Sequence, residues 1–217
     1  MSEDNRYYKL TPEQLKQYID YKEIYIVDTR EIPLCQKGYI GNSIIIPLSM
    51  SYTTWLPKVI KSNSYVILIT DNEHLNESLY MTASLNIYYI IGYALYDELI
   101  SSNLFNIETI EYNDNTKEEI EKIANYRNVI IDVREINEFK NTGIIKEALL
   151  LPLSCVNDEI YKIPQIGNIY VYCRSGMRAV TYMTYAKRAG YKNKIIIMEG
   201  GMLKAIQEGF PLVPFSG

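Results

Sequence analysis

Short apolar runs without polar alternation recur along the chain, and each is followed by a stretch with helical spacing. In the first half one run ends at Asp28 and another covers residues 65–69; in the second half one run ends at Asp132 and another covers residues 169–172. Strands buried on both faces read as continuous apolar runs, and their alternation with helices is typical of a parallel sheet. The pattern predicts an α/β fold, with mostly parallel strands and helices on both faces of each sheet.

Helix-start signals stand ahead of the first run in each half. Thr11-Pro12-Glu13-Gln14 places a capping hydroxyl before a proline and a Gln at the third helical position, and residues 116–119 form a second capping box. Near the end of the chain, residues 194–198 read as a strand and residues 202–208 as a helix.

The two halves are copies of one unit. Asp132 stands 104 residues after Asp28, in the same Asp-x-Arg-Glu-Ile setting. Two further blocks repeat at offsets of 105 and 102 residues: 43–49 with 148–154, and 80–82 with 182–184. A unit of about 105 residues has the size of a small domain, and residues 101–115 are polar and lack strong periodicity. We therefore expect two domains, residues 1–105 and residues 106–217.

Composition and charge narrow the class of protein. With 47% hydrophobic and 22% charged residues, the chain has the composition of a soluble globular protein, and its net charge of −4 gives no basic surface for nucleic acid. No apolar run approaches the roughly 20 residues of a membrane span, and the opening residues lack the apolar core of a signal peptide. We expect a cytoplasmic protein that binds neither nucleic acid nor membrane.

Scarce residue types argue against a metalloenzyme. The chain has one histidine, His74, and three cysteines, Cys35, Cys155 and Cys173, of which the closest two are 18 residues apart. One histidine cannot build a multi-histidine site, and there is no Cys-x-x-Cys motif. We expect no metal, no cofactor and three reduced thiols.

Cys173 is the candidate nucleophile. It directly follows an apolar run, and small and basic residues come next, in the order Arg174, Ser175, Gly176, Met177 and Arg178. Loops at the carboxyl ends of parallel strands form the ligand crevice of such folds, and backbone N–H groups at a helix start attract anions. Thiols in these surroundings have pKa values lowered to roughly 3.5–7.5, and the thiolate is the reactive form. The sequence therefore predicts a nucleophilic thiolate in this loop.

The alternative for each cysteine is a small, buried apolar side chain. Two arginines and a glycine within six residues argue against an apolar burial for Cys173. Cys35 and Cys155 have no basic neighbours in sequence, so burial is the better prediction for them. Cys155 also follows a Pro-Leu-Ser turn, which leaves open a second interpretation as a resolving thiol at the same mouth.

The first copy has no thiol at the matching place. Alignment on residues 80–82 puts Asp71 opposite Cys173, and a slip of one residue puts Thr70 there. The two carboxylates of this loop would repel an anion, and the neighbouring His74 lacks a nucleophile beside it. We expect the first copy to be catalytically inactive.

Residues 129–211 resemble the rhodanese, or thiosulfate sulfurtransferase, domain. The resemblance rests on Cys-Arg-Ser-Gly-Met-Arg after a strand, on Asp-Val-Arg-Glu about 40 residues earlier, and on Glu199-Gly200-Gly201-Met202 after it. The first copy is similar to a rhodanese domain that lacks the active-site cysteine. Such a degenerate domain occurs in proteins that fuse a metallo-β-lactamase-type persulfide dioxygenase to tandem rhodaneses, although a single histidine leaves no dioxygenase here. The resemblance implies two tandem rhodanese-like domains.

The resemblance also implies a ping-pong sulfur transfer by the second domain. Cys173 would take the sulfane sulfur of thiosulfate or of a small persulfide or polysulfide, and an acceptor such as cyanide or a thiol would then remove it. The main-chain N–H groups of residues 174–178 would stabilise that sulfur, and the side chains of Arg174 and Arg178 would attract anionic donors. By the same analogy two further residues would be structural: Asp132 and Arg134.

Two positions depart from the usual pattern of the family. Ile144 follows Gly143 where relatives usually have His, and Ile206 stands where they usually have Trp. Both are turn or packing positions, so they affect the expected donor more than the expected reaction.

Two other functions compete with this interpretation. A phosphatase of the Cys-x5-Arg type needs an arginine six positions after the cysteine; Ala179 stands there and Arg178 comes one position earlier, so the loop is one residue short for a tetrahedral oxyanion. A sulfur carrier or protein-interaction module with little turnover is the stronger rival, because an inactive first copy indicates that one domain serves something other than chemistry. That domain could cover the active-site mouth or dock a protein partner.

Overall fold

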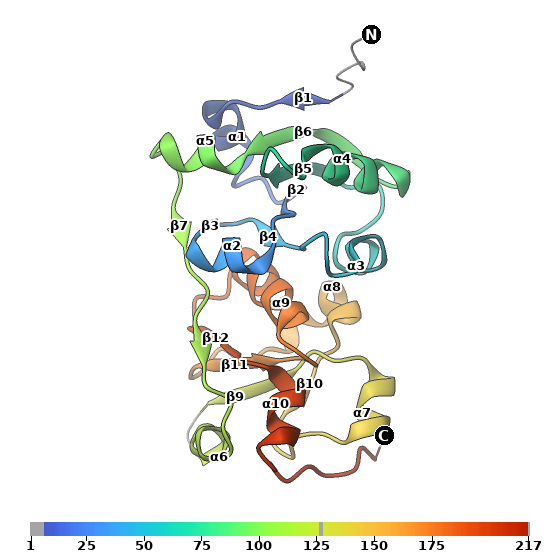
Figure 1. Ribbon diagram of the computed structural model, residues 1–217, viewed down its shortest axis with the longest axis vertical. Helices are drawn as coiled ribbons and strands as arrows, with labels where there is room; N and C mark the ends of the chain where they lie inside the picture. Colours follow the sequence, from blue (N-terminus) through green and yellow to red (C-terminus); the bar gives the residue numbers. More distant parts are fainter. Residues whose placement is uncertain (1–6, 126–127, 217) are drawn as a thin grey trace. The chain divides into compact units, whose positions relative to one another are not determined.

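The computed structural model describes residues 7–125 and 128–216. Contacts divide the chain into two compact units, Met1–Thr109 and Ile110–Gly217 (Figure 1). The sequence placed the boundary between residues 105 and 106, and the structure places it four residues later. The reason is that strand β7 (Ile107–Glu108) pairs antiparallel with strand β3 (Tyr39–Ile40) and so belongs to the first unit.

The first unit holds a parallel sheet and its helices. The sheet strands are β1 (Tyr8–Lys9), β2 (Ile24–Asp28), β4 (Ile44–Ile45), β5 (Tyr65–Thr70) and β6 (Tyr89–Leu95). The helices are α1 (Pro12–Tyr18), α2 (Ile32–Lys37), α3 (Tyr52–Val59), α4 (Leu75–Ser84) and α5 (Tyr96–Ser101). The strand order in this sheet is β1-β6-β5-β2-β4, and each of these pairings is parallel.

The expected cap begins α1. The Thr11 side chain accepts a hydrogen bond from the Gln14 N–H, the Thr11 N–H donates one to the Gln14 side-chain oxygen, and Pro12 is the first residue of the helix. Leu15 and Ile19 then pack with Ile67 of β5 in the core. The capping box therefore fixes where the helix starts, and the start decides which side chains reach the sheet.

The second unit repeats this arrangement. Its sheet strands are β8 (Tyr112–Asn113), β9 (Val129–Asp132), β10 (Leu149–Leu150), β11 (Ile169–Tyr172) and β12 (Ile195–Met198). Its helices are α6 (Lys117–Asn125), α7 (Ile136–Thr142), η1 (Leu153–Cys155), α8 (Val156–Glu159), η2 (Ile160–Lys162), α9 (Met177–Arg188) and α10 (Gly201–Gln207). The order β8-β12-β11-β9-β10 is parallel throughout and matches the first sheet strand for strand.

Helices cover both faces of the second sheet. Ile120 of α6 and Met202 of α10 pack on one face, against Ile130 and Met198 of the strands. Side chains alternate along a strand, so their neighbours in sequence point to the other face, where α9 and α8 lie (Figure 1). Two parallel sheets flanked by helices confirm the predicted α/β class.

Each unit closes with the same antiparallel return. In the first unit β7 pairs with β3. In the second unit Ile144 and Val213 exchange two backbone hydrogen bonds of 2.9 Å, and they form an isolated antiparallel bridge. The repeat seen in the sequence therefore extends to the final segment of each unit. No helix among the described residues is long and apolar enough to cross a membrane.

Candidate active site

Cys173 lies directly after β11, the central strand of its sheet. Three residues connect it to α9, a helix of 12 residues, so the sulfur stands between the carboxyl end of a parallel strand and the amino end of a helix. The residue is only 1% exposed, whereas Arg174 and Ser175 are exposed and Met177 is half-buried. The loop thus keeps its thiol inside and turns a basic side chain outward.

The loop backbone turns toward the sulfur. The Gly176 N–H donates a hydrogen bond to the Cys173 Sγ over 3.1 Å. Gly176 has φ +110°, a conformation that side chains rarely adopt, and a Cβ at this position would have no neighbour within 4 Å. Backbone conformation, not space, therefore requires glycine here, and this conformation aims the N–H at the sulfur.

Helix α10 holds the loop in place through two backbone hydrogen bonds. The N–H of Met202 donates to the Cys173 carbonyl over 2.8 Å, and the N–H of Leu203 donates to the Arg174 carbonyl over 3.1 Å. Gly201, with φ +55°, permits this approach, because a Cβ there would lie 2.3 Å from the Cys173 carbonyl oxygen. The loop carbonyls are thus hydrogen-bonded to α10 rather than aimed at the sulfur. The sequence pointed to this Gly-Gly pair but not to its structural task.

Arg178 is held by a partner that the sequence did not suggest. Its guanidinium donates two hydrogen bonds to Glu138, Nη1 to Oε2 over 2.5 Å and Nη2 to Oε1 over 2.8 Å. Glu138 lies in the first turn of α7 and also accepts the N–H of Glu135, completing a capping box. The expected role of the Arg178 side chain toward anionic donors stays a prediction, and a carboxylate already occupies its guanidinium fork. In the sequence, the three-residue spacing of Glu135 and Glu138 was the feature that could have drawn attention to this carboxylate.

The pKa values of this pair follow from burial and contact. Burial alone would raise the pKa of Glu138, but the hydrogen bonds from Arg178 and from the Glu135 N–H, together with the charges of Arg178 and Arg134, outweigh burial, and the pKa lies below its usual value. Burial would lower the pKa of Arg178, and the hydrogen bonds to Glu138, together with the electrostatic interaction with Cys173, raise it instead. Both groups are charged at neutral pH.

Asp132 and Arg134 form a buried ion pair at the end of β9. Arg134 donates from Nε to Asp132 Oδ1 over 3.0 Å and from Nη2 to Oδ2 over 2.7 Å, and both residues are at most 1% exposed. The same guanidinium reaches the Thr142 hydroxyl over 2.6 Å and the Gly143 carbonyl over 2.8 Å. The pair thus links the end of the strand to the end of α7.

Glu135 connects the next loop to the same helix. It stands at the start of α7, and its carboxylate accepts the Ser154 hydroxyl over 2.7 Å. Cys155 follows, half-buried, with its sulfur 3.8 Å from the Ser154 hydroxyl. Cys155 is therefore less buried than the sequence suggested.

Similarity to known proteins falls on this unit. Residues 116–208 match the family model of the rhodanese-like domain. The matched residues include Cys173, its loop, Glu138 and the whole of α10.

The chain is also similar to three named proteins. A sulfurtransferase of Allochromatium vinosum is 29% identical over 89 residues, which are 41% of this chain and 81% of that protein. A rhodanese-related protein of Thermoplasma volcanium superposes with a TM-score of 0.41 at 24% identity, over 47% of this chain and 98% of that chain. A thiosulfate sulfurtransferase of Pseudomonas aeruginosa does so with a TM-score of 0.40 at 18% identity, over 96% of this chain and 44% of that chain.

The first unit differs from the second unit at the matching strand end. Pairing of β2 with β5 sets Asp28 opposite Ile69, and pairing of β9 with β11 sets the second Asp of the repeat opposite Tyr172. The next residue is Thr70 in the first unit and Cys173 in the second. The Thr70 hydroxyl is buried and lies 3.0 Å from the Ser78 hydroxyl.

Counted from the helix, Asp71 takes this place instead. Asp71 lies four residues before α4, as Cys173 lies four residues before α9, so the first loop is one residue longer. The Asp71 carboxylate accepts the His74 N–H and contacts the His74 Nδ1, both at 2.8 Å. The alignment of Thr70 with Cys173 therefore holds on the strand side of the loop, and the alignment of Asp71 with Cys173 holds on the helix side. A carboxylate, not a thiol, receives the loop N–H in the first unit.

Cys35 is a buried thiol away from any such loop. It lies in α2, is fully buried, and its sulfur contacts the Arg30 carbonyl over 3.6 Å. Burial, and then the nearby Asp28 carboxylate, raise the pKa of this thiol far above its usual value. Cys35 therefore stays protonated and behaves as an apolar side chain.

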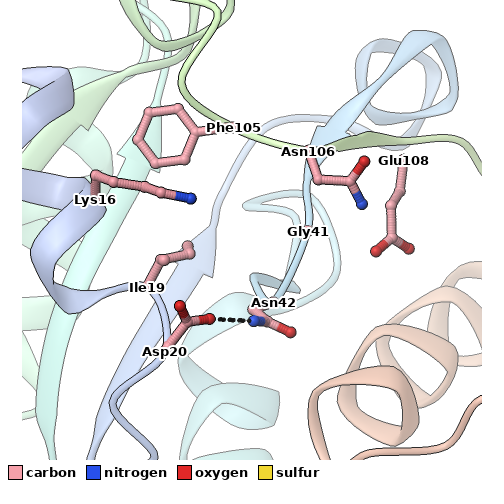
Figure 2. A pocket seen from close by; sticks show the side chains of 8 residues that line it. All are labelled: Lys16, Ile19, Asp20, Gly41, Asn42, Phe105, Asn106 and Glu108. Carbon is pink, nitrogen blue, oxygen red and sulfur yellow. Dashed lines mark hydrogen bonds between the residues drawn. The ribbon is translucent and has the colours of Figure 1, made fainter.

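A cavity of about 130 Å³ lies elsewhere in the first unit (Figure 2). Its lining residues are Lys16, Ile19, Asp20, Gly41, Asn42, Phe105, Asn106 and Glu108. The Asn42 amide donates to Asp20 over 3.0 Å, and the Lys16 ammonium lies 5.7 Å from the centre of the Phe105 ring. Asp20 precedes β2 and Asn42 precedes β4, so the cavity lies toward the amino ends of these strands, opposite the Thr70 loop.

Metal-ligand geometry is not found in the part of the chain that the structure describes: there, no three or more His, Cys, Asp or Glu side chains form a group that could hold a metal ion.

Proposed function

We propose that the rhodanese-like domain is a sulfurtransferase that works through a persulfide on Cys173. The donor would be thiosulfate or a small persulfide or polysulfide, and the acceptor would be cyanide or a thiol. The family match and the sulfurtransferase relative support the reaction class. The identity of the nucleophile is supported by geometry.

The two half-reactions balance without a cofactor. The Cys173 thiolate attacks the outer sulfur of thiosulfate, a new S–S bond forms, and sulfite leaves with the electron pair of the broken S–S bond. Cyanide then attacks the terminal sulfur of the persulfide, thiocyanate leaves, and the thiolate returns. A thiol acceptor would leave as its own persulfide in the same way.

One contact supports the choice of Cys173 as nucleophile more than any other observation. The Gly176 N–H donates to the Cys173 sulfur at 3.1 Å, in a loop whose Cys173 and Arg174 carbonyls are hydrogen-bonded to α10. Such a loop can stabilise negative charge on a single sulfur atom with its own N–H groups. The N–H groups of Arg174, Ser175, Gly176, Met177 and Arg178 would share this task, and the exposed Arg174 side chain would attract an anionic donor.

A phosphatase is less well supported. Arg178 comes five positions after Cys173, and its fork is occupied by Glu138. A tetrahedral oxyanion needs a free guanidinium within a wider loop. A sulfur carrier that loads Cys173 but turns over slowly remains the rival, with the first unit, which has no thiol in its loop, as a docking surface for a protein partner.

Steady-state sulfur transfer tests the proposal. Thiocyanate formation from thiosulfate and cyanide, and sulfur transfer from glutathione persulfide to a thiol, should both fall to the uncatalysed rate in Cys173→Ser. Cys155→Ser is the matched control, because it removes the other thiol of the same unit, which is half-buried. Full activity of Cys173→Ser would overturn the assignment. Loading of Cys173 without turnover would favour the carrier.

A further inference from the structure

Glu138 is bonded to Arg178, which lies in the first turn of the helix that follows the Cys173 loop. Its carboxylate is fixed by three contacts, two from the Arg178 guanidinium and one from the Glu135 N–H at 3.0 Å. The Arg178 and Glu138 side chains are only 12% and 29% exposed. A fork-to-fork ion pair of this kind fixes both groups with little freedom.

The charges around the sulfur do not favour a doubly charged donor. Arg178 interacts with the Cys173 thiolate, with Glu138 and with the neighbouring Glu135. Its one positive charge is therefore already paired with the Glu138 carboxylate, which accepts hydrogen bonds from both of its Nη groups. Arg174 adds a second positive charge, but its side chain is exposed and makes no ion pair with the described residues, so solvent screens it.

We propose that Glu138 is a positioning residue that holds Arg178 beside the Cys173 loop, offsets its charge, and so biases the site toward donors with less negative charge than the thiosulfate dianion. Persulfides that carry a single charge at the reacting end form this class. The proposal rests on the proposed sulfurtransferase function for its donor class, but not for its electrostatics.

Glu138→Gln separates charge from geometry. Glutamine at the third position of a helix still accepts the Glu135 N–H of the capping box, and its amide oxygen still accepts one bond from Arg178. Two sulfonyl donors then differ in charge: thiosulfate carries two negative charges, and benzenethiosulfonate, with a phenyl group in place of one oxygen, carries one. Each transfers the same kind of sulfane sulfur. Each variant is compared with wild type on the same donor, so the effect of the phenyl group cancels.

The expected gain scales with donor charge. Removing one carboxylate charge near the loop should raise kcat/KM about tenfold for thiosulfate and about threefold for benzenethiosulfonate, and both gains should shrink at high salt. Glu159→Gln is the control: it removes a carboxylate of the same unit from an exposed pair with Lys162, and the ratio of the two donors should stay unchanged. Equal gains for both donors, or losses for either, would overturn the proposal.

Alkylation of the thiol gives a test that needs no sulfur transfer. Iodoacetate carries one negative charge and iodoacetamide none, and mass spectrometry can follow the peptide that contains Cys173. Glu138→Gln should raise the ratio of iodoacetate to iodoacetamide rates about threefold. If the wild-type protein transfers no sulfur but this ratio rises, the proposed function fails while the role of Glu138 stands. An unchanged ratio would contradict the role of Glu138.

Discussion

The loop after β5 and the loop after β11 leave matching strand positions and enter matching helices, but different side chains receive their backbone N–H groups. In the second unit the Gly176 N–H points to a thiol. In the first unit the His74 N–H points to the Asp71 carboxylate, and the loop is one residue longer. The sheets are otherwise alike. A shared scaffold therefore fixes where a reactive group can stand, and the loop alone decides whether one does.

The Asp–Arg pair is the feature that the two units share most closely. Asp28 and Arg30 bond in the first unit as Asp132 and Arg134 do in the second, with Nη2 to Oδ2 distances of 2.6 and 2.7 Å. Asp28→Asn and Asp132→Asn should each cost about 3–5 kcal/mol, because each leaves a buried guanidinium without its counter-charge. Urea unfolding checks the size of the effect.

Separate reporters make this comparison sharp. Trp55 in α3 is the single tryptophan of the chain, so its fluorescence reports the first unit. Asp28→Asn should shift the Trp55 transition to lower urea, and Asp132→Asn should speed hydrogen exchange in β9 and β11. A loss below about 1 kcal/mol in either unit would mean that the pair contributes no more than an exposed one.

Much of this arrangement is readable from the sequence, for physical reasons. Continuous apolar runs, capping boxes and the 104-residue repeat are local or self-referring signals, and they predict two parallel α/β units. The sequence signal for the Cys173 loop is equally local, because its residues are contiguous in the chain. The pairing of Arg178 with Glu138 is not, because it joins residues 40 apart on two helices that only the folded sheet brings together.

Two other features needed the structure for the same reason. Strand β7 belongs to the first unit only through its pairing with β3, and two residues of strand carry little signal in a polar segment. The extra residue of the Asp71 loop showed in the sequence as two competing alignments. Strand register on one side and the helix start on the other show that both describe part of the loop.

Gly201 is a second place where the units can be separated. Gly201→Ala should destabilise the second unit by about 1–3 kcal/mol, because its Cβ would overlap the Cys173 carbonyl, and sulfur transfer should fall as the loop shifts. Gly209→Ala is the matched control: Gly209 has φ +69° and open space around a Cβ, so the variant carries the backbone strain without the overlap. Equal effects on sulfur transfer in the two variants would contradict the bracing role of α10. Thermal unfolding and kcat measure them.

The smallest expected effect lies in the first loop and depends on pH. The hydrogen bond with Asp71 raises the pKa of His74 above its ordinary value of 6.5. The stability that the His74–Asp71 pair contributes should therefore be fully present below about pH 6.5, and it should be lost as the pH rises through the pKa of His74 in the folded protein. Asp71→Asn should lose it, at a cost within about 1 kcal/mol, since the pair is solvent-accessible.

The Trp55 urea transition at a series of pH values provides the measurement. The difference between wild type and Asp71→Asn should narrow from pH 5.5 toward pH 8.5. A difference that widens with rising pH would show that charged His74 is not what the carboxylate stabilises.

The central claim is that the second unit, and not the first, holds a sulfur-accepting thiolate on Cys173. Intact mass after incubation with thiosulfate, and separately with glutathione persulfide, tests it most directly, followed by peptide mapping and by treatment with cyanide. We predict a gain of one sulfur atom on the peptide that contains Cys173, removed by cyanide, and none on the peptides of residues 1–109. No gain on reduced protein, or a gain on Cys35 or Cys155 alone, would contradict the account.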